Sequence, residues 1–168
     1  LSRCSSRLSA LLRAFTRWDS AHFLTASLQG WDGAPEYAHA FFPAYPLAVR
    51  WLAMLLAWLG LSGVCDEALH ALAGVLLSNV CFVVAACSLH RLSECVLDDV
   101  ELARASVYAF CVTPASVFFS SNYAESAFAA ASFGGLALLE LGYEWEAALA
   151  LSLASGCRAN GVLNALFI

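Results

Sequence analysis

The chain has 168 residues, of which 61% are hydrophobic and 12% are charged. Soluble domains carry roughly a quarter charged residues, so this composition excludes a soluble globular protein and a disordered chain and indicates a membrane protein. The 13 acidic and 8 basic residues give a formal net charge of −5, and no basic cluster is large enough to follow a phosphate backbone. Nucleic acid is therefore excluded as a partner.

The first residues and the cysteines are those of a membrane-associated chain. The sequence starts at Leu1 and stops at Ile168 inside an apolar run, so we expect it to be part of a longer polytopic protein. Arginines alternate with leucines at the start, without the order of a cleaved signal, which predicts an amphipathic stretch on the membrane. The seven cysteines are scattered singly and are predicted to be small buried hydrophobic residues.

Four apolar stretches are long enough to cross a bilayer core of about 30 Å, which needs about 20 helical residues. A fifth stretch, 47–61, is shorter, follows two prolines and carries Arg50, so it is a doubtful span. The four predicted spans are 68–90, 103–121, 124–142 and 147–168.

The most polar and aromatic part of the sequence is 15–46, and a second polar loop is predicted at 91–104. If the polar groups of 17–39 meet those of 120–125 on one face, an even number of crossings must separate them. The stretch 47–61 is therefore predicted to lie along the membrane face. The loop 91–104, which carries two arginines, then lies on the cytosolic side.

Two carboxylates in the first polar stretch are candidates for acid–base chemistry. Asp19 follows Trp18, whose ring can exclude water, and could accept a proton from a sugar hydroxyl. The alternative is that Asp19 is an N-cap of the next helix. Glu36 is a candidate for holding substrate, or else a solvated loop acid. His22 and His39 match no ligand spacing, so no metal is assigned.

A second polar group separates two predicted spans. Asn122, Tyr123 and Glu125 would present an amide, a phenol and a carboxylate to a membrane cavity. The alternative is a capping box, in which Asn122 and Glu125 only start the next helix. Ala131 and Gly135 predict a close helix-packing face.

Arg158 lies in the middle of an apolar stretch, where a cation costs about 3 kcal/mol. Its guanidinium could hold a phosphate through paired N–H groups, with Asn160 nearby. The alternative is a structural ion pair with Glu125 or Glu140. Asn79 is predicted to bond two helices to each other.

Four strings of residues occur in order within and beside these stretches. They are FTRWDS (15–20) with HFL (22–24), Glu36 with AFFP (40–43), PASVF (114–118) with YAES (123–126), and GCRANGVLN (156–164). Their order and spacing resemble the N-terminal part of the GPI mannosyltransferase 2 (PIG-V) family of GT-C glycosyltransferases. Ala124 and Ala159 depart from the pattern, since the family commonly has serine there.

The resemblance implies an all-α fold, a polytopic transmembrane helical bundle of GT-C type whose luminal first loop contains membrane-parallel helices. Residues 1–168 would form part of a single transmembrane GT-C domain, with 1–67 as the luminal loop with interfacial helices and 68–168 as about four transmembrane helices. The first span and the C-terminal half of the family would lie outside this sequence. The chain alone is therefore not expected to be active.

The resemblance also implies the reaction. The family transfers the second, α1,6-linked mannose from dolichol-phosphate-mannose to the GPI-anchor precursor in the lumen of the endoplasmic reticulum, by a single inverting displacement without a cofactor or metal. Asp19 would be the catalytic base. The substrate-binding residues would be Arg17, Trp18, Glu36, Asn122, Tyr123, Glu125, Arg158 and Asn160.

The expected partners are the dolichol-linked donor, the GPI lipid precursor, membrane lipids and a small accessory membrane subunit, in a multi-pass protein of the endoplasmic reticulum with a luminal active site. The alternative is a transporter or channel subunit, with Arg158, Glu125 and Asn79 lining a permeation path. That alternative leaves the aromatic and acidic first loop unexplained, and the span pattern has no internal repeat. A membrane scaffold would leave Asp19 and Arg158 without a role.

Overall fold

The computed structural model describes residues 7–32 and 36–167, and all regular secondary structure in these ranges is helical. The all-α prediction is therefore confirmed for this part of the chain. The elements are α1 (Arg7–Leu12), η1 (Arg13–Phe15), α2 (Ser20–Gln29), η2 (Glu36–Ala40), α3 (Ala44–Leu56), η3 (Ala57–Leu61), α4 (Asp66–Leu97), α5 (Val100–Cys111), α6 (Ser116–Ser120), α7 (Glu125–Glu140), α8 (Glu144–Cys157) and η4 (Ala159–Phe167).

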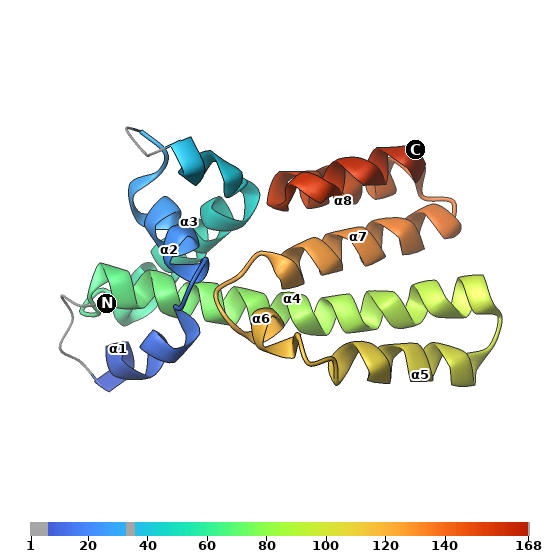
Figure 1. Cartoon of the computed structure of the whole chain (residues 1–168), viewed down its shortest axis with the longest axis horizontal. Helices are drawn as coiled ribbons and strands as arrows, with labels where there is room; N and C mark the ends of the chain where they lie inside the picture. The colour runs from blue at the N-terminus through green and yellow to red at the C-terminus, as the bar shows by residue number, and fades with distance from the viewer. Residues whose placement is uncertain (1–6, 33–35, 168) are drawn as a thin grey trace.

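The long helix α4 organises the structure (Figure 1). Its 32 residues extend over about 48 Å, at 1.5 Å per residue, which is more than a bilayer core requires. Helices α5 and α7 pack along α4, and α8 packs on α7. The elements α1, α2 and α3 gather around the N-terminal half of α4, where they position the candidate site.

The predicted polar loop at 91–104 is wrong, because almost all of it is helical. Helix α4 continues to Leu97 and α5 begins at Val100. The chain reverses at Asp98, which adopts the left-handed conformation with φ of 50°. Aspartate tolerates this conformation better than most residues do, so two residues suffice for the turn.

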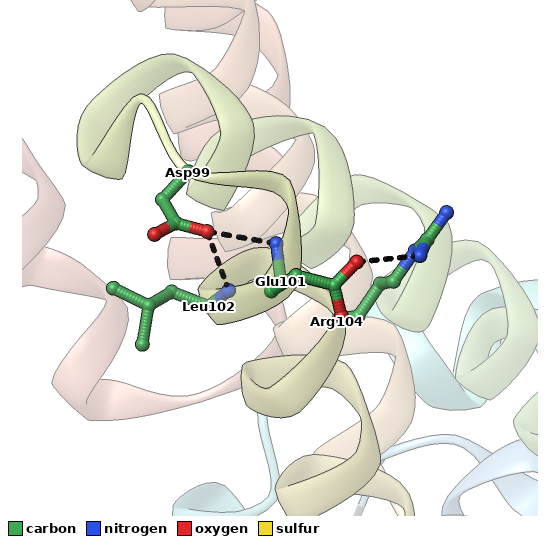
Figure 2. Close-up of polar contacts among 4 residues, drawn as sticks. All are labelled: Asp99, Glu101, Leu102 and Arg104. Carbon is green, nitrogen blue, oxygen red and sulfur yellow. Dashed lines mark hydrogen bonds and ion pairs between the residues drawn. The ribbon is translucent and has the colours of Figure 1, made fainter.

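Asp99 explains why α5 starts where it does (Figure 2). Its carboxylate accepts hydrogen bonds from the backbone N–H groups of Glu101 (2.8 Å) and Leu102 (3.1 Å), as an N-cap residue does. Glu101 also pairs with Arg104 at 2.7 Å. The charged residues that led to the prediction of a loop therefore stabilise the first turn of α5.

Two of the predicted spans are broken. The stretch 103–121 is divided between α5 and α6, with Pro114 in the gap, because proline lacks an N–H group and disfavours helix in the residue before it. The stretch 147–168 ends as an α-helix at Cys157, and Arg158 is extended (φ −151°, ψ 147°). The predicted span 124–142 forms one unbroken helix, α7, whose 16 residues are fewer than the about 20 that a crossing needs, so its crossing of the membrane stays a prediction.

Within the described ranges, two helical stretches are long and apolar enough to cross a membrane, Ala44–Leu61 and Asp66–Leu97. The second contains the predicted span 68–90. The first contains the doubtful stretch 47–61, so length and composition do not separate a crossing helix from an interfacial one there. The placement of 47–61 along the membrane face stays a prediction.

Close helix packing agrees with the small residues in the sequence. A Cβ atom on Gly135 would lie 2.7 Å from the side chain of Leu151, so α7 and α8 approach closely there, as predicted. The Asn79 side chain donates to the carbonyl of Ser120 at 3.1 Å, which joins α4 to α6 and confirms the predicted bond between helices.

The cysteine prediction is only partly right. Cys157 is buried and free, whereas the free thiols of Cys87 and Cys95 are exposed on α4. Cys65, at the N-cap of α4, is disulfide-bonded. The positions of isolated cysteines in the sequence do not reveal such a bond, because the fold decides which cysteine lies near enough to be the partner.

A buried polar cluster fixes the segment before α7. The hydroxyl of Tyr45 lies 2.8 Å from the Ser78 hydroxyl, 2.9 Å from the side-chain oxygen of Asn122 and 3.1 Å from the carbonyl of Gly74. Ser78 donates to the carbonyl of Tyr123 at 3.1 Å. A Cβ atom on Gly74 would lie 2.0 Å from Asn122, so only glycine fits beneath this amide. The cluster therefore holds residues 122–123 against α3 and α4.

Candidate functional site

Three segments that are far apart in the sequence line one cavity of about 390 Å³. They come from the N-terminal polar stretch, from the start of α7 and from the break after α8. The predicted meeting of the polar groups of 17–39 with those of 120–125 is therefore confirmed for Asp19, Tyr123 and Glu125. The polar residues of the cavity are Asp19, Tyr123, Glu125, Arg158 and Asn160, and its aromatic residues include Phe23, Phe41 and Phe42.

Asp19 lies at the N-cap position of α2, but its side chain makes no capping hydrogen bond. Its carboxylate is exposed at the cavity, so the alternative that Asp19 only caps the helix receives no support. Trp18, just before it, has φ of 51°, a conformation that is rare for a bulky residue and persists only where the surrounding structure fixes it.

Two hydrogen bonds from the segment before α7 fix this conformation. The hydroxyl of Tyr123 donates to the carbonyl of Arg17 at 2.9 Å, and the N–H of Asn122 donates to the carbonyl of Phe15 at 3.3 Å. Burial raises the pKa of Tyr123, and the nearby carboxylates of Asp19 and Glu125 raise it further. The phenol therefore stays protonated, and remains a donor, at neutral and mildly alkaline pH.

Arg158 forms an ion pair with Glu125, the first residue of α7. Of the two carboxylates considered from the sequence, the structure thus selects Glu125 and not Glu140. The bend that brings Arg158 there is held by Ser155, whose hydroxyl lies 2.9 Å from the carbonyl of Gly161 and donates to it. The side chains of Arg158 and Glu125 are 38% and 28% exposed, so the ion pair is only partly buried. It is therefore accessible from the cavity that both residues line.

The second carboxylate oxygen of Glu125 is a buried acceptor to which no residue of the described ranges donates a hydrogen bond. A buried acceptor without a donor is costly, and such groups in native proteins are commonly satisfied by water or by a ligand. At the edge of a polar cavity, this oxygen is suited to receive a hydroxyl group of a bound molecule.

Aromatic residues also line the cavity. Phe41 stacks on His22, with ring centres 4.8 Å apart, and meets the edge of Phe23 at 5.1 Å. His22 also contacts the ring of Tyr37. His22 therefore belongs to an aromatic cluster, and the described residues contain no group of three metal-ligating side chains.

Residues 2–168 match the profile of the family described as Mannosyltransferase (PIG-V). The chain belongs to the PIG-V mannosyltransferase family. This assignment favours the enzyme over the transporter or channel subunit considered from the sequence. No solved structure matches the chain significantly.

Individual relatives agree with the family. The PIG-V chain is 37% identical to GPI alpha-1,6-mannosyltransferase 2 of Rattus norvegicus over 162 residues, which are 96% of this chain and 32% of that protein. It is 33% identical to the Homo sapiens protein of the same name over 162 residues, which are again 96% of this chain and 32% of that protein. It is 29% identical to GPI mannosyltransferase 2 of Chaetomium globosum over 93% of this chain and 38% of that protein. The chain thus spans about a third of the relatives' length.

The predicted site residues of the PIG-V chain divide between the cavity and its surroundings. Asp19, Tyr123, Glu125, Arg158 and Asn160 line the cavity. The others do not line it. Glu36 is exposed at the start of η2, Arg17 and Trp18 border neighbouring cavities, and Asn122 is fully buried in the Tyr45 cluster.

The capping box considered at the start of α7 is not formed. The N-cap residue is Ala124, which makes no side-chain cap, and the Asn122 oxygen lies instead at the Tyr45 hydroxyl. The aromatic lining was missed as a part of the site. Its signal in the sequence was the Phe41-Phe42 pair beside the polar loop, but only the fold shows that these residues line the same cavity as Asp19 and Glu125.

Proposed function

We propose that the full-length protein transfers the second, α1,6-linked mannose of the GPI anchor from dolichol-phosphate-mannose in the lumen of the endoplasmic reticulum. Membership of the PIG-V family and the names of the relatives support GPI mannosyl transfer. The observation that carries the proposal is that the exposed Asp19 and the Arg158–Glu125 pair line the same cavity.

The donor chemistry assigns the steps. A β-linked mannosyl phosphate that gives an α product requires inversion, so one in-line displacement with one base is sufficient. Asp19 accepts the proton of the acceptor hydroxyl while the oxygen of that hydroxyl bonds to the anomeric carbon. The bond from that carbon to the phosphate oxygen breaks, and dolichyl phosphate leaves with the electron pair.

Arg158 and Glu125 have complementary roles in this proposal. The guanidinium of Arg158 has further N–H groups beyond the one bonded to Glu125, and these stabilise the charge that develops on the leaving phosphate. The free oxygen of Glu125 accepts a sugar hydroxyl. Asn160 and the aromatic rings orient the sugar, and the reaction requires neither a metal nor a cofactor.

The remaining predicted binding residues take less direct positions in the proposal. Arg17 and Trp18 border the approach to Asp19, and Glu36 lies on the exposed rim of the polar stretch. Tyr123 holds the backbone of Arg17, while Asn122 supports Tyr123 from the interior.

We also propose that the N-terminal end of α4 faces the lumen, within a multi-pass GT-C domain in which 1–67 is luminal and 68–168 forms the transmembrane part. The disulfide at Cys65 supports this orientation, because disulfides persist in oxidising compartments. The free and exposed Cys87 and Cys95 lie further along α4, toward the turn at Asp98.

Glycosylation acceptor sites test the orientation. An Asn-X-Ser/Thr acceptor built at the exposed Gly63, before α4, is expected to be glycosylated in the full-length protein. An acceptor built at Asp98, in the exposed turn after α4, is expected to stay unmodified. Mobility before and after glycosidase treatment measures both. The reverse pattern would place the candidate site on the cytosolic side and contradict the proposal.

Complementation tests the function itself. In cells that lack GPI mannosyltransferase 2, expression of the full-length protein is expected to restore GPI-anchored proteins at the cell surface, as measured by flow cytometry. Residues 1–168 alone, expressed to the same level, are the control and are not expected to restore them. Failure of the full-length protein to restore surface proteins, although it is present in the endoplasmic reticulum, would contradict the proposed activity.

A further inference from the structure

A second cavity, of about 480 Å³, lies between η1, α2 and the first turn of α4. It shares no residue with the candidate active site. Two arginines and three uncharged polar residues line it, together with one carboxylate and an apolar floor. The polar and charged residues are Arg13, Thr16, Arg17, Thr25, Gln29 and Glu67.

An apolar groove of about 330 Å³ lies on the other side of the segment 13–18. Its walls include Phe15, Trp18, Val117 and Phe118, and the rings of Trp18 and Phe118 are 6.4 Å apart. Arg17 borders both this groove and the cationic cavity. The segment therefore borders both a charged compartment and an apolar one.

The groove also reaches the candidate active site, because Tyr123 borders both. A molecule that spans the cavities would thus have an anionic group near the arginines, a hydrocarbon part against the aromatic rings and a polar extension toward Asp19. Arginine binds phosphate oxygens through paired N–H groups, and an apolar groove removes a hydrocarbon chain from water. These are the chemical features of an anionic phospholipid.

We propose that the two cavities bind one anionic phospholipid, with its phosphate at Arg13 and Arg17 and a hydrocarbon chain in the groove. The inference rests on the proposed function in one respect, since it assigns this place to the lipid part of the acceptor. Both arginines are exposed, so a headgroup can reach them. Glu67 lies on the α4 side of the same cavity.

The binding experiment uses the purified full-length protein in detergent, without donor or turnover. Thermal unfolding is measured against the concentration of dioctanoyl phosphatidylinositol, dioctanoyl phosphatidylcholine or inorganic phosphate. Phosphatidylinositol is expected to stabilise the protein at the lowest concentration, because only this probe has both a net negative headgroup and a chain. Arg13→Gln and Arg17→Gln are each expected to weaken its binding about tenfold.

Matched controls separate the site from the rest of the surface. Arg104 is an exposed arginine on α5 that pairs with Glu101 and lines neither cavity, so Arg104→Gln is expected to leave binding unchanged. Val117→Trp fills the groove and is expected to remove the advantage of the dioctanoyl lipid over inorganic phosphate. Val112→Trp, at another exposed valine that lies outside the groove, is expected to keep that advantage.

Several results would overturn the proposal. They are equal affinity for phosphatidylinositol and phosphatidylcholine, binding of inorganic phosphate as tight as that of the lipid, and equal losses in Arg104→Gln and Arg13→Gln. Because no mannose is transferred in this experiment, these results leave the proposed activity untouched. Failed complementation with intact lipid binding would instead reject the activity and keep the lipid site.

Discussion

Asp19→Asn in the full-length protein is expected to lower mannosyl transfer by about 100-fold or more, with no change in expression. Asparagine keeps the size of the side chain but cannot accept a proton from the acceptor hydroxyl. The Asp19 side chain makes no capping hydrogen bond and is exposed at the cavity, so the fold loses nothing by its replacement. Transfer is measured in microsomes with dolichol-phosphate-mannose and the GPI precursor, at matched protein levels.

Asp32 provides the matched control. It is an exposed aspartate of the same polar stretch and does not line the candidate active site, so Asp32→Asn is expected to transfer mannose normally. Near-normal transfer by Asp19→Asn would show that Asp19 is only the residue that precedes α2. An equal loss of transfer in both variants would show that the total charge of the N-terminal polar stretch matters, and would contradict the role of Asp19 as a base.

Arg158→Leu is expected to reduce both the amount of folded protein and its activity. It leaves the Glu125 carboxylate in a partly buried position without its cation. Removing one partner of a fully buried pair costs about 3–5 kcal/mol, and the partial exposure of both side chains reduces this to about 1–3 kcal/mol. The amount that survives in cells and the midpoint of thermal unfolding measure the loss.

A second substitution separates the structural role of Arg158 from its role toward phosphate. Arg158→Leu with Glu125→Gln removes the stranded charge, so the amount of folded protein is expected to recover while transfer stays low. Glu140→Gln is the matched control, because Glu140 is the other carboxylate of α7 and does not pair with Arg158; it is expected to give no recovery. Recovery of transfer along with folding would reduce Arg158 to a structural residue.

The conservative variant completes this series. Arg158→Lys keeps the positive charge beside Glu125 but loses the planar arrangement of N–H groups. We expect near-normal folding and a raised KM for the dolichol-linked donor. A normal KM would show that the charge alone matters at this position, and that paired hydrogen bonds to phosphate do not.

The sequence by itself determined the membrane class, the helical fold and the residue types of the site. Apolar length and low charge are local properties, so α4 and α7 could be predicted from them. The polar residues that interrupt the apolar stretches, Asp19, Glu125 and Arg158, stand out for the same reason, because such groups are costly in an apolar setting.

Only the tertiary structure decided how these residues meet. Hydropathy does not distinguish a polar loop from a capped helix, so the turn at Asp98 and Asp99 was missed, and it does not show that the chain bends at Arg158. Glu125 and Glu140 lie on the same helix, and the choice between them depends on which end of α7 the end of α8 reaches. Ion pairing and cavities are set by contacts between distant segments, which local composition does not encode.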